Sequence, residues 1–160
     1  MSTHLEQARE AYKSEQAVLA GNRARTALAH ERLALAALAA VEAGEDLNEV
    51  GRAIGLHPTN AAELIEKARQ LAPALPGRPG RSPEHVIMRY AAGEISREEL
   101  IETLATWPYV QAQPITEGLH DDYASFTPGS FDEVEKAANL SYIDDDTYEV
   151  ILQRYALRYQ

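Results

Sequence analysis

The sequence predicts an all-α protein with two helical parts. Alanine is abundant and proline absent from residues 3 to 43, and apolar residues recur at helical spacing through much of the chain. One stretch rich in proline, glycine and arginine, residues 73–83, interrupts this pattern. We therefore expect a helical domain over residues 1–72, a linker over residues 73–83 and an acidic helical domain over residues 84–160.

Residues 3 to about 43 are predicted to form a long helix, with Gly21 and Asn22 as a candidate break. A stripe at seven-residue spacing consists of Leu5, Tyr12 and Leu19. Such a stripe is typical of a short coiled-coil seam, which predicts a homodimer, but the companion positions Glu15 and Asn22 are polar. We expect the helix to pack on its own domain, and the homodimer stays open as the alternative.

Residues 46–71 predict two helices joined by a tight turn. Gly51 falls where the two helices would cross closely, and Gly55 can take the left-handed conformation that ends a helix. Asp46 is a candidate N-cap of the first helix, and Pro58 suits the first turn of the second. Apolar or small residues at helical spacing are Leu47, Val50, Ile54, Leu56, Ala61, Leu64, Ile65 and Ala68.

This stretch resembles the helix-turn-helix class of DNA-binding domains. In that class the start of the second helix enters the major groove. The resemblance implies base contacts by His57, Thr59, Asn60 and Glu63, with Asn60 suited to adenine and Glu63 to cytosine. Candidates for phosphate contacts are Arg52, Lys67, Arg69, Arg78 and Arg81. A purely structural three-helix turn is the alternative.

The linker is expected to be extended and solvated. It contains Gly77-Arg78-Pro79, the core of the short minor-groove element called an AT-hook, followed by Arg81. Pro76 stands where that element usually carries another arginine, so a plain linker is favoured over a DNA-binding arm.

The net charge of −10 is confined to one half of the chain. Residues 1 to 82 carry ten acidic and ten Lys or Arg side chains, whereas residues 83 to 160 carry fifteen acidic and five basic ones. An acidic surface repels nucleic acid and steers basic proteins toward it. The second half therefore predicts a basic protein partner.

That half is predicted to fold as two helical hairpins. Residues 86–107 and 134–155 form a weak repeat, in which Val86 matches Val134 and Ile95 matches Ile143. Ser96 and Asp144 are the matching candidate N-caps of each second helix. Two hairpins that each have one apolar face can bury those faces against each other.

Between the hairpins lies a segment, residues 108–130, with three prolines, two glycines and three aromatic residues. A connection of this length is usually functional or disordered. Either its aromatics anchor a protein partner, or they fold back and cap a small core. The predicted partner-binding surface consists of Trp107, Tyr109, Asp121, Asp122, Tyr123, Asp144, Asp145 and Asp146.

The sequence predicts no catalytic site, cofactor or metal. It lacks a Gly-rich phosphate loop, a nucleophile elbow and a His-Glu-x-x-His pattern, and it has no cysteine. The polar, acidic start is unlike a signal peptide, and the very apolar run 33–41 is too short to cross a bilayer. We expect a cytoplasmic protein with no membrane partner.

Two functions follow from these patterns. The leading hypothesis is a small DNA-binding regulator with a protein-binding acidic half, similar in architecture to antitoxins. The alternative is an acidic inhibitor or immunity-type protein that binds a target protein and never binds DNA.

Overall fold

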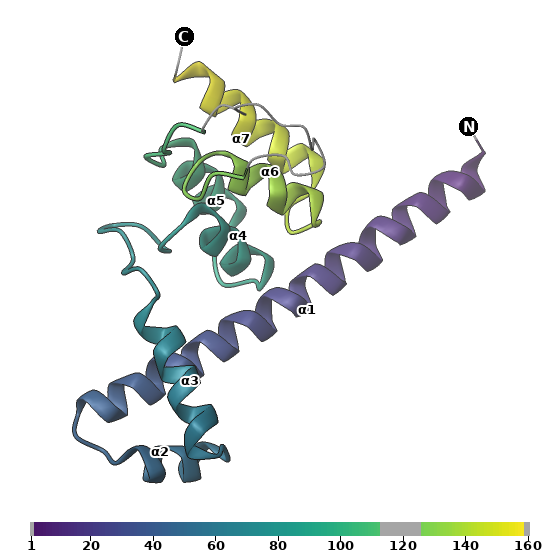
Figure 1. The fold of residues 1–160 in the computed structure, drawn as a ribbon. Coiled ribbons are helices and arrows are strands. Elements are labelled where there is room, and N and C mark those ends of the chain that lie inside the picture. The colour runs from purple at the N-terminus through teal and green to yellow at the C-terminus, as the bar shows by residue number, and fades with distance from the viewer. Residues whose placement is uncertain (1, 113–125, 159–160) are drawn as a thin grey trace, which may run out of the picture. The chain divides into compact units, whose positions relative to one another are not determined.

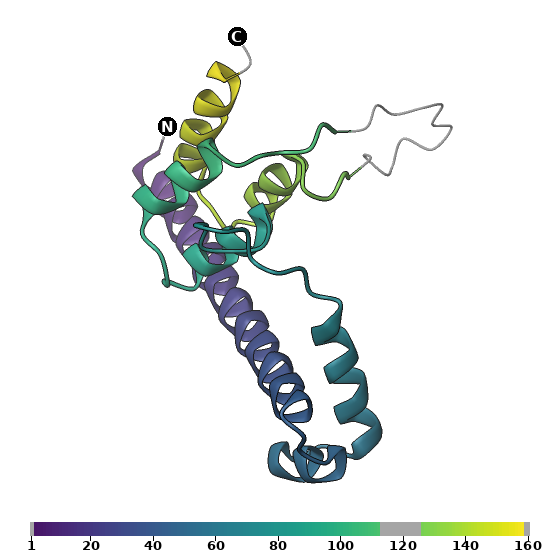
Figure 2. The same cartoon turned by 90° about the vertical axis from the view of Figure 1, so that its left-hand side faces the viewer.

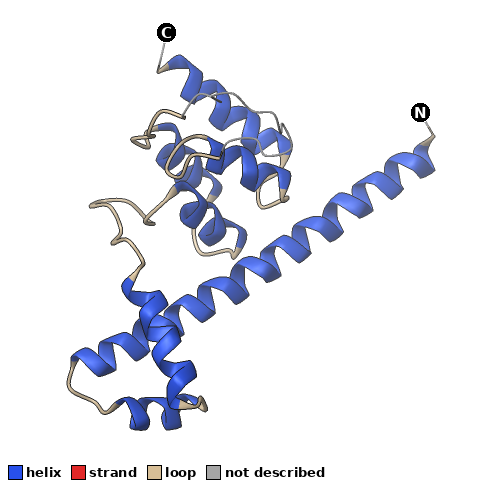
Figure 3. Ribbon diagram, viewed as in Figure 1, coloured by secondary structure: helices blue, strands red, loops and turns tan. Residues whose placement is uncertain are grey.

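The computed structural model describes residues 2–112 and 126–158, and within these ranges the fold is all-α (Figures 1 and 3). The helices are α1 (Thr3–Glu42), α2 (Leu47–Ile54), α3 (Pro58–Arg69), α4 (Pro83–Ala91), α5 (Arg97–Ala105), α6 (Asp132–Asn139) and α7 (Asp145–Leu157). They form two compact units. The small unit is Thr26–Pro73, and the large unit joins Met1–Arg25 to Ala74–Gln160.

This division differs from the one expected from the sequence, which placed residues 1–72 in one domain. The helix α1 runs without a break through Gly21 and contributes to both units. Gly21 is buried, and a Cβ atom there would lie 3.1 Å from the carbonyl oxygen of Ala91. The glycine that was a candidate break instead permits close approach of α1 and the end of α4.

The core of the small unit lies between the second half of α1 and the pair α2 and α3. Ala34, Leu64 and Ala68 form one buried group. Ala37, Val50 and Ile65 form another, and Leu38 and Ile54 pack against both groups. The residues that the sequence placed on the inner faces of residues 46–71 are therefore the ones that hold this unit together.

The large unit contains the two predicted hairpins, α4 with α5 and α6 with α7. Matching helices pack together, α4 against α6 and α5 against α7 (Figures 1 and 2). Both hairpins contribute to one core, whose buried residues are Val86, Ile87, Leu100, Ile101, Leu104, Trp107, Phe131, Val134, Ala137, Ile143 and Ile151. The expectation that the hairpins bury their apolar faces against each other is confirmed.

The first helix of each hairpin ends in the same turn geometry. Gly93 and Ser141, which are matching positions of the repeat, both have positive φ, 84° and 66°. The backbone N–H of Gly93 donates to the carbonyl of Tyr90, and that of Ser141 donates to the carbonyl of Ala138. The same helix-ending geometry thus occurs twice, and in the second copy a serine accepts a conformation that usually favours glycine.

The linker differs from the extended, solvated chain that its composition predicts. Residues 72–77 are exposed, but Arg78 and Pro79 are half-buried and Gly80 is buried. A Cβ atom on Gly80 would lie 2.8 Å from the side chain of Val86, so only glycine fits there. The second part of the linker is consequently packed onto the large unit, directly before α4.

Candidate nucleic-acid interface and acidic surface

The turn between α2 and α3 is built as the sequence predicts. Asp46 caps α2 by accepting from the N–H of Asn48 at 3.4 Å, and Gly55 ends α2 with φ of 73°. A Cβ atom on Gly51 would lie 2.8 Å from the carbonyl oxygen of Leu56 and 3.6 Å from Cβ of Ala61. The close crossing of α2 with the turn therefore requires glycine at position 51.

The start of α3 is capped by a histidine. The imidazole Nδ1 of His57 accepts from the N–H of Thr59 at 3.2 Å, and Pro58 occupies the first helical position. This bond places the proton of a neutral imidazole on Nε2, which is left to donate outward. His57, which the resemblance assigns to base contact, is thus also the N-cap of α3.

The helix α3 has one buried and one exposed face. Ala61, Leu64, Ile65 and Ala68 are buried against the small unit. The residues of the small unit that were predicted to contact DNA are exposed, and they are Arg52, His57, Thr59, Asn60, Glu63, Lys67 and Arg69. Helical spacing gathers Thr59, Asn60, Glu63 and Lys67 on the outer side of α3, while Arg52 lies on α2.

Two of the arginines around this face are paired with carboxylates of the small unit. Arg52 pairs with Glu49 at 2.8 Å, and Arg69 pairs with Glu66 at 3.5 Å, each one turn along a helix. Residues 26–73 carry seven acidic and four basic side chains, a net charge of −3. Exposed pairs of this kind stabilise little and can be exchanged for other partners. The small unit nevertheless lacks an excess of positive charge.

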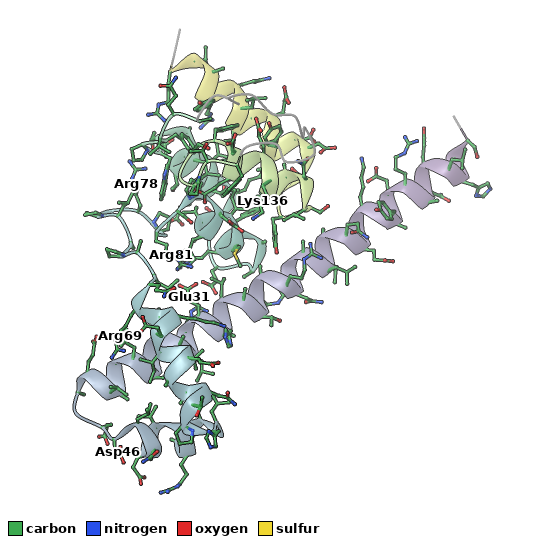
Figure 4. The ribbon with its side chains drawn as sticks, viewed as in Figure 1. Glu31, Asp46, Arg69, Arg78, Arg81 and Lys136 are labelled. Atoms are coloured by element: carbon green, nitrogen blue, oxygen red, sulfur yellow. The ribbon has the colours of Figure 1, made fainter. Side chains whose placement is uncertain are left out.

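Arg78 does not extend into solvent as a free arm. Its guanidinium donates to the carbonyl of Thr106 at 3.2 Å and lies 5.1 Å from the ring centroid of Trp107 (Figure 4). The backbone N–H of Arg81 donates to Nδ1 of His85 at 3.2 Å. Arg78 and Arg81 are both half-buried, because this part of the chain packs onto the large unit directly before α4 begins. Arg78 thus has structural contacts within the large unit, and its minor-groove role stays a prediction.

The acidic surface comes from the first turns of two neighbouring helices. Asp145 and Asp146 are exposed at the start of α7, where the helix dipole favours carboxylates. The Nε of Arg97, at the start of α5, donates to Oγ1 of Thr147 at 3.1 Å and joins these two helix starts. Glu98 and Glu99 follow Arg97 in the first turn of α5, and their exposed side chains add two carboxylates to this surface. Together these four residues form an acidic patch: Glu98, Glu99, Asp145 and Asp146.

Sequence reasoning missed Glu98 and Glu99, although a signal for them existed. The repeat aligns the first turn of α5 with the first turn of α7, since Ser96 and Asp144 are matching caps. Packing of matching helices in the two hairpins then places both acidic turns side by side.

Asp144 is a capping residue as well as a surface acid. Its carboxylate accepts from the N–H of Thr147 at 2.7 Å. Burial tends to raise the pKa of this carboxyl, but the bonds to Thr147 and the charge of Arg97 outweigh burial and hold the pKa below its ordinary value. Asp144 therefore stays ionised at neutral pH and stabilises the start of α7.

The aromatic residues predicted to anchor a partner lie in the core instead. Trp107 is 3% exposed. The hydroxyl of Tyr109 donates to the carbonyl of Leu104 at 2.6 Å, and its ring packs edge-on against Phe131 and Tyr155. These contacts agree with the second interpretation of the connecting segment, in which aromatics cap the core. Asp121, Asp122 and Tyr123 lie outside the described residues.

An open groove of about 490 Å³ lies beside Trp107 in the large unit. Its walls are mainly apolar, and they are formed by Leu75, Arg81, Ser82, Pro83, Glu84, Trp107, Pro108, Val110, Phe126, Pro128, Gly129 and Glu133. Glu133 is buried, and its carboxylate accepts from the backbone N–H groups of Glu84 and Gly129. The carboxylate thus holds the groove walls together.

Within residues 2–112 and 126–158, no three His, Asp or Glu side chains are grouped so that they could hold a metal ion. None of the helices in this part of the chain combines the length and the apolar character that crossing a membrane requires.

Comparison with family models, with curated proteins and with solved structures found no match to this chain.

Proposed function

We propose that this chain is a DNA-binding regulator that reads DNA with the outer face of α3 and binds a basic protein with the acidic patch. One observation supports the first part most strongly. The α2–α3 pair has the close crossing, the left-handed turn and the exposed outer face of the second helix that insertion into a major groove requires.

The outer face of α3 offers specific chemistry. The amide of Asn60 can pair with the N6 and N7 atoms of adenine, and the carboxylate of Glu63 can accept from N4 of cytosine. His57 can donate from Nε2 while Nδ1 stays in the cap. Lys67 lies farther along the same side, where it can reach a phosphate. Arg52 and Arg69 can join it by exchanging carboxylate for phosphate oxygens.

Binding to DNA should fall steeply with salt. Three phosphate contacts, from Arg52, Lys67 and Arg69, predict a slope of log affinity against log salt of roughly −2.7, at about −0.9 per contact. Lys67→Ala should weaken binding to all sequences and reduce the slope by about one contact. Asn60→Ala should instead cost about 1–3 kcal/mol on the preferred sequence only.

The measurement is fluorescence anisotropy across a salt series, with the upstream region of the protein's own gene and with sequences selected from a random pool. Lys13→Ala removes the same charge from an exposed site on α1 and should leave binding unchanged. A folded protein that retains no DNA even at low salt would rule out this function.

The charge balance favours a second function, an inhibitor that binds a protein and not DNA. The small unit has a net charge of −3, and residues 74–160 carry fifteen acidic and seven basic side chains, a net charge of −8. A net negative charge on both units disfavours the approach of a phosphate backbone and favours that of a basic protein.

The acidic patch gives a test that applies to both functions. Converting Asp145 and Asp146 together to lysine should lower the association rate of a co-purified basic partner about tenfold at low salt, and less at high salt. Stopped-flow measurements with the full chain would show this. Converting Glu6 and Glu10 to lysine on α1 makes the same change in net charge and is the control. An equal loss of rate in both variants would show that total charge acts, and not the patch.

A further inference from the structure

The first part of α1 is not packed against the rest of its own unit. Residues 3 to 19 are all exposed except Gln16, which is half-buried. Burial begins at Ala20 and Gly21, where α1 meets other parts of the large unit. Helices of this length are marginal in water without packing on an apolar face. The helix α1 packs on the rest of the chain from Ala20 onward, and residues 3–19 are the part for which the expected packing is not seen.

The exposed segment carries large apolar side chains in a regular row. Leu5 is 62% exposed, Tyr12 63% and Leu19 44%, and they are spaced seven residues apart. Leu33, at the same phase farther along α1, is 37% exposed. In a straight helix of 3.6 residues per turn, side chains seven residues apart drift around the helix axis. In a left-handed coiled coil the same side chains all face one partner helix.

The residues three positions after Leu5, Tyr12 and Leu19 complete the seam, and their chemistry determines which partner helix can pack against it. They are Ala8, Glu15 and Asn22, which are small or polar. We propose that the partner is a second copy of this chain, whose α1 packs antiparallel against this row. This inference does not depend on DNA binding.

An antiparallel second copy places unlike residues opposite each other. Leu19 then meets Ala8 of the other copy, so that a large side chain fills the space above a small one. Tyr12 meets Glu15, whose carboxylate can accept from the tyrosine hydroxyl. Each contact occurs twice, as a two-fold interface requires. In a parallel pair the Glu15 carboxylates would face each other and repel.

Charge also favours a second copy at this place. Residues 1–25 carry four basic and three acidic side chains, whereas the whole chain has a net charge of −10. Two copies can therefore approach along this segment with little repulsion. Residues 5 to 22 extend about 25 Å at 1.5 Å per residue. A seam of that length is smaller than a standard interface, so dimerisation is expected only at micromolar or higher concentration.

Sedimentation of the full chain at increasing concentration tests this inference. The wild-type mass should rise from 17.6 kDa toward twice that value. Tyr12→Glu and Leu19→Glu should each weaken the dimer at least about tenfold, because each substitution acts twice in the interface. Ala17→Glu adds the same charge on the far side of the exposed helix and should dimerise as the wild type does.

A single disulfide can report the orientation, since the chain has no cysteine of its own. Under mild oxidation, a mixture of Ala8→Cys and Leu19→Cys proteins should form a mixed disulfide, and Ala8→Cys alone should not. Circular dichroism at low concentration checks that the variants are folded. A monomer at every concentration, equal loss in the Ala17→Glu control, or faster cross-linking of Ala8→Cys with itself would overturn the proposal.

Discussion

Trp107→Ala is expected to destabilise the large unit by about 3–5 kcal/mol, the usual cost of truncating a buried tryptophan. The ring is 3% exposed and belongs to the core shared by both hairpins. Its loss leaves a cavity and also removes the cation–π contact of Arg78. Since a typical domain is stable by about 5–15 kcal/mol, a large fraction of the population should unfold under mild denaturant. Urea unfolding followed by far-ultraviolet circular dichroism measures this.

The matched control for this variant is Leu157→Ala, which truncates a side chain that is 64% exposed at the end of α7. Its effect should stay within about 0.5 kcal/mol. The opposite result is equally informative. If Trp107→Ala keeps wild-type stability but releases a protein partner, Trp107 is the surface anchor that the sequence predicted, and the core described above is incorrect.

Gly51→Val is expected to destabilise the small unit by about 2–3 kcal/mol, within the range for overpacked sites. The first atom of the new side chain would lie 2.8 Å from the carbonyl oxygen of Leu56, which is backbone and cannot rotate away. The α2–α3 crossing would have to open. Valine gains some helix propensity over glycine, but by less than about 1 kcal/mol, so the steric term decides the sign.

Two probes separate the units in this experiment. Trp107 is the single tryptophan of the chain and lies in the large unit, so its fluorescence reports that unit, whereas circular dichroism reports all helices. Gly51→Val should move the circular dichroism transition to lower urea and leave the fluorescence transition in place. Ala53→Val, at an exposed position of α2, is the control. Unfolding of Gly51→Val at the wild-type urea concentration would contradict the close crossing.

The same variant connects stability to the proposed function. If DNA is read by the outer face of α3, opening the crossing should also abolish specific binding, because the angle between α2 and α3 positions that face. Loss of DNA binding in Gly51→Val, with retained binding of a basic partner at the acidic patch, would assign the two activities to separate units.

The sequence by itself determined the helices and their ends. These depend on residues close together in the chain. Gly55 ends α2 in the left-handed conformation, Pro58 starts α3, and Ser96 caps α5 by accepting from the N–H of Glu99. The exposed face of α3 followed from the same periodicity, whereas the candidate DNA contacts on it are implied by the resemblance to the helix-turn-helix class. The repeat likewise predicted two hairpins that share one core.

Only the tertiary structure decided which of these surfaces are free. The guanidinium of Arg78 reaches Thr106, 28 residues away, and helps to hold the second part of the linker on the large unit. Arg97 reaches Thr147, 50 residues away, and assembles the acidic patch from two helices. Composition gives no account of such pairings, because an arginine in a Gly-Pro segment reads as solvated until its partner is known. The aromatic Trp107 and the apolar row on α1 show the same limit, since only the packed chain shows that the first is buried and the second exposed.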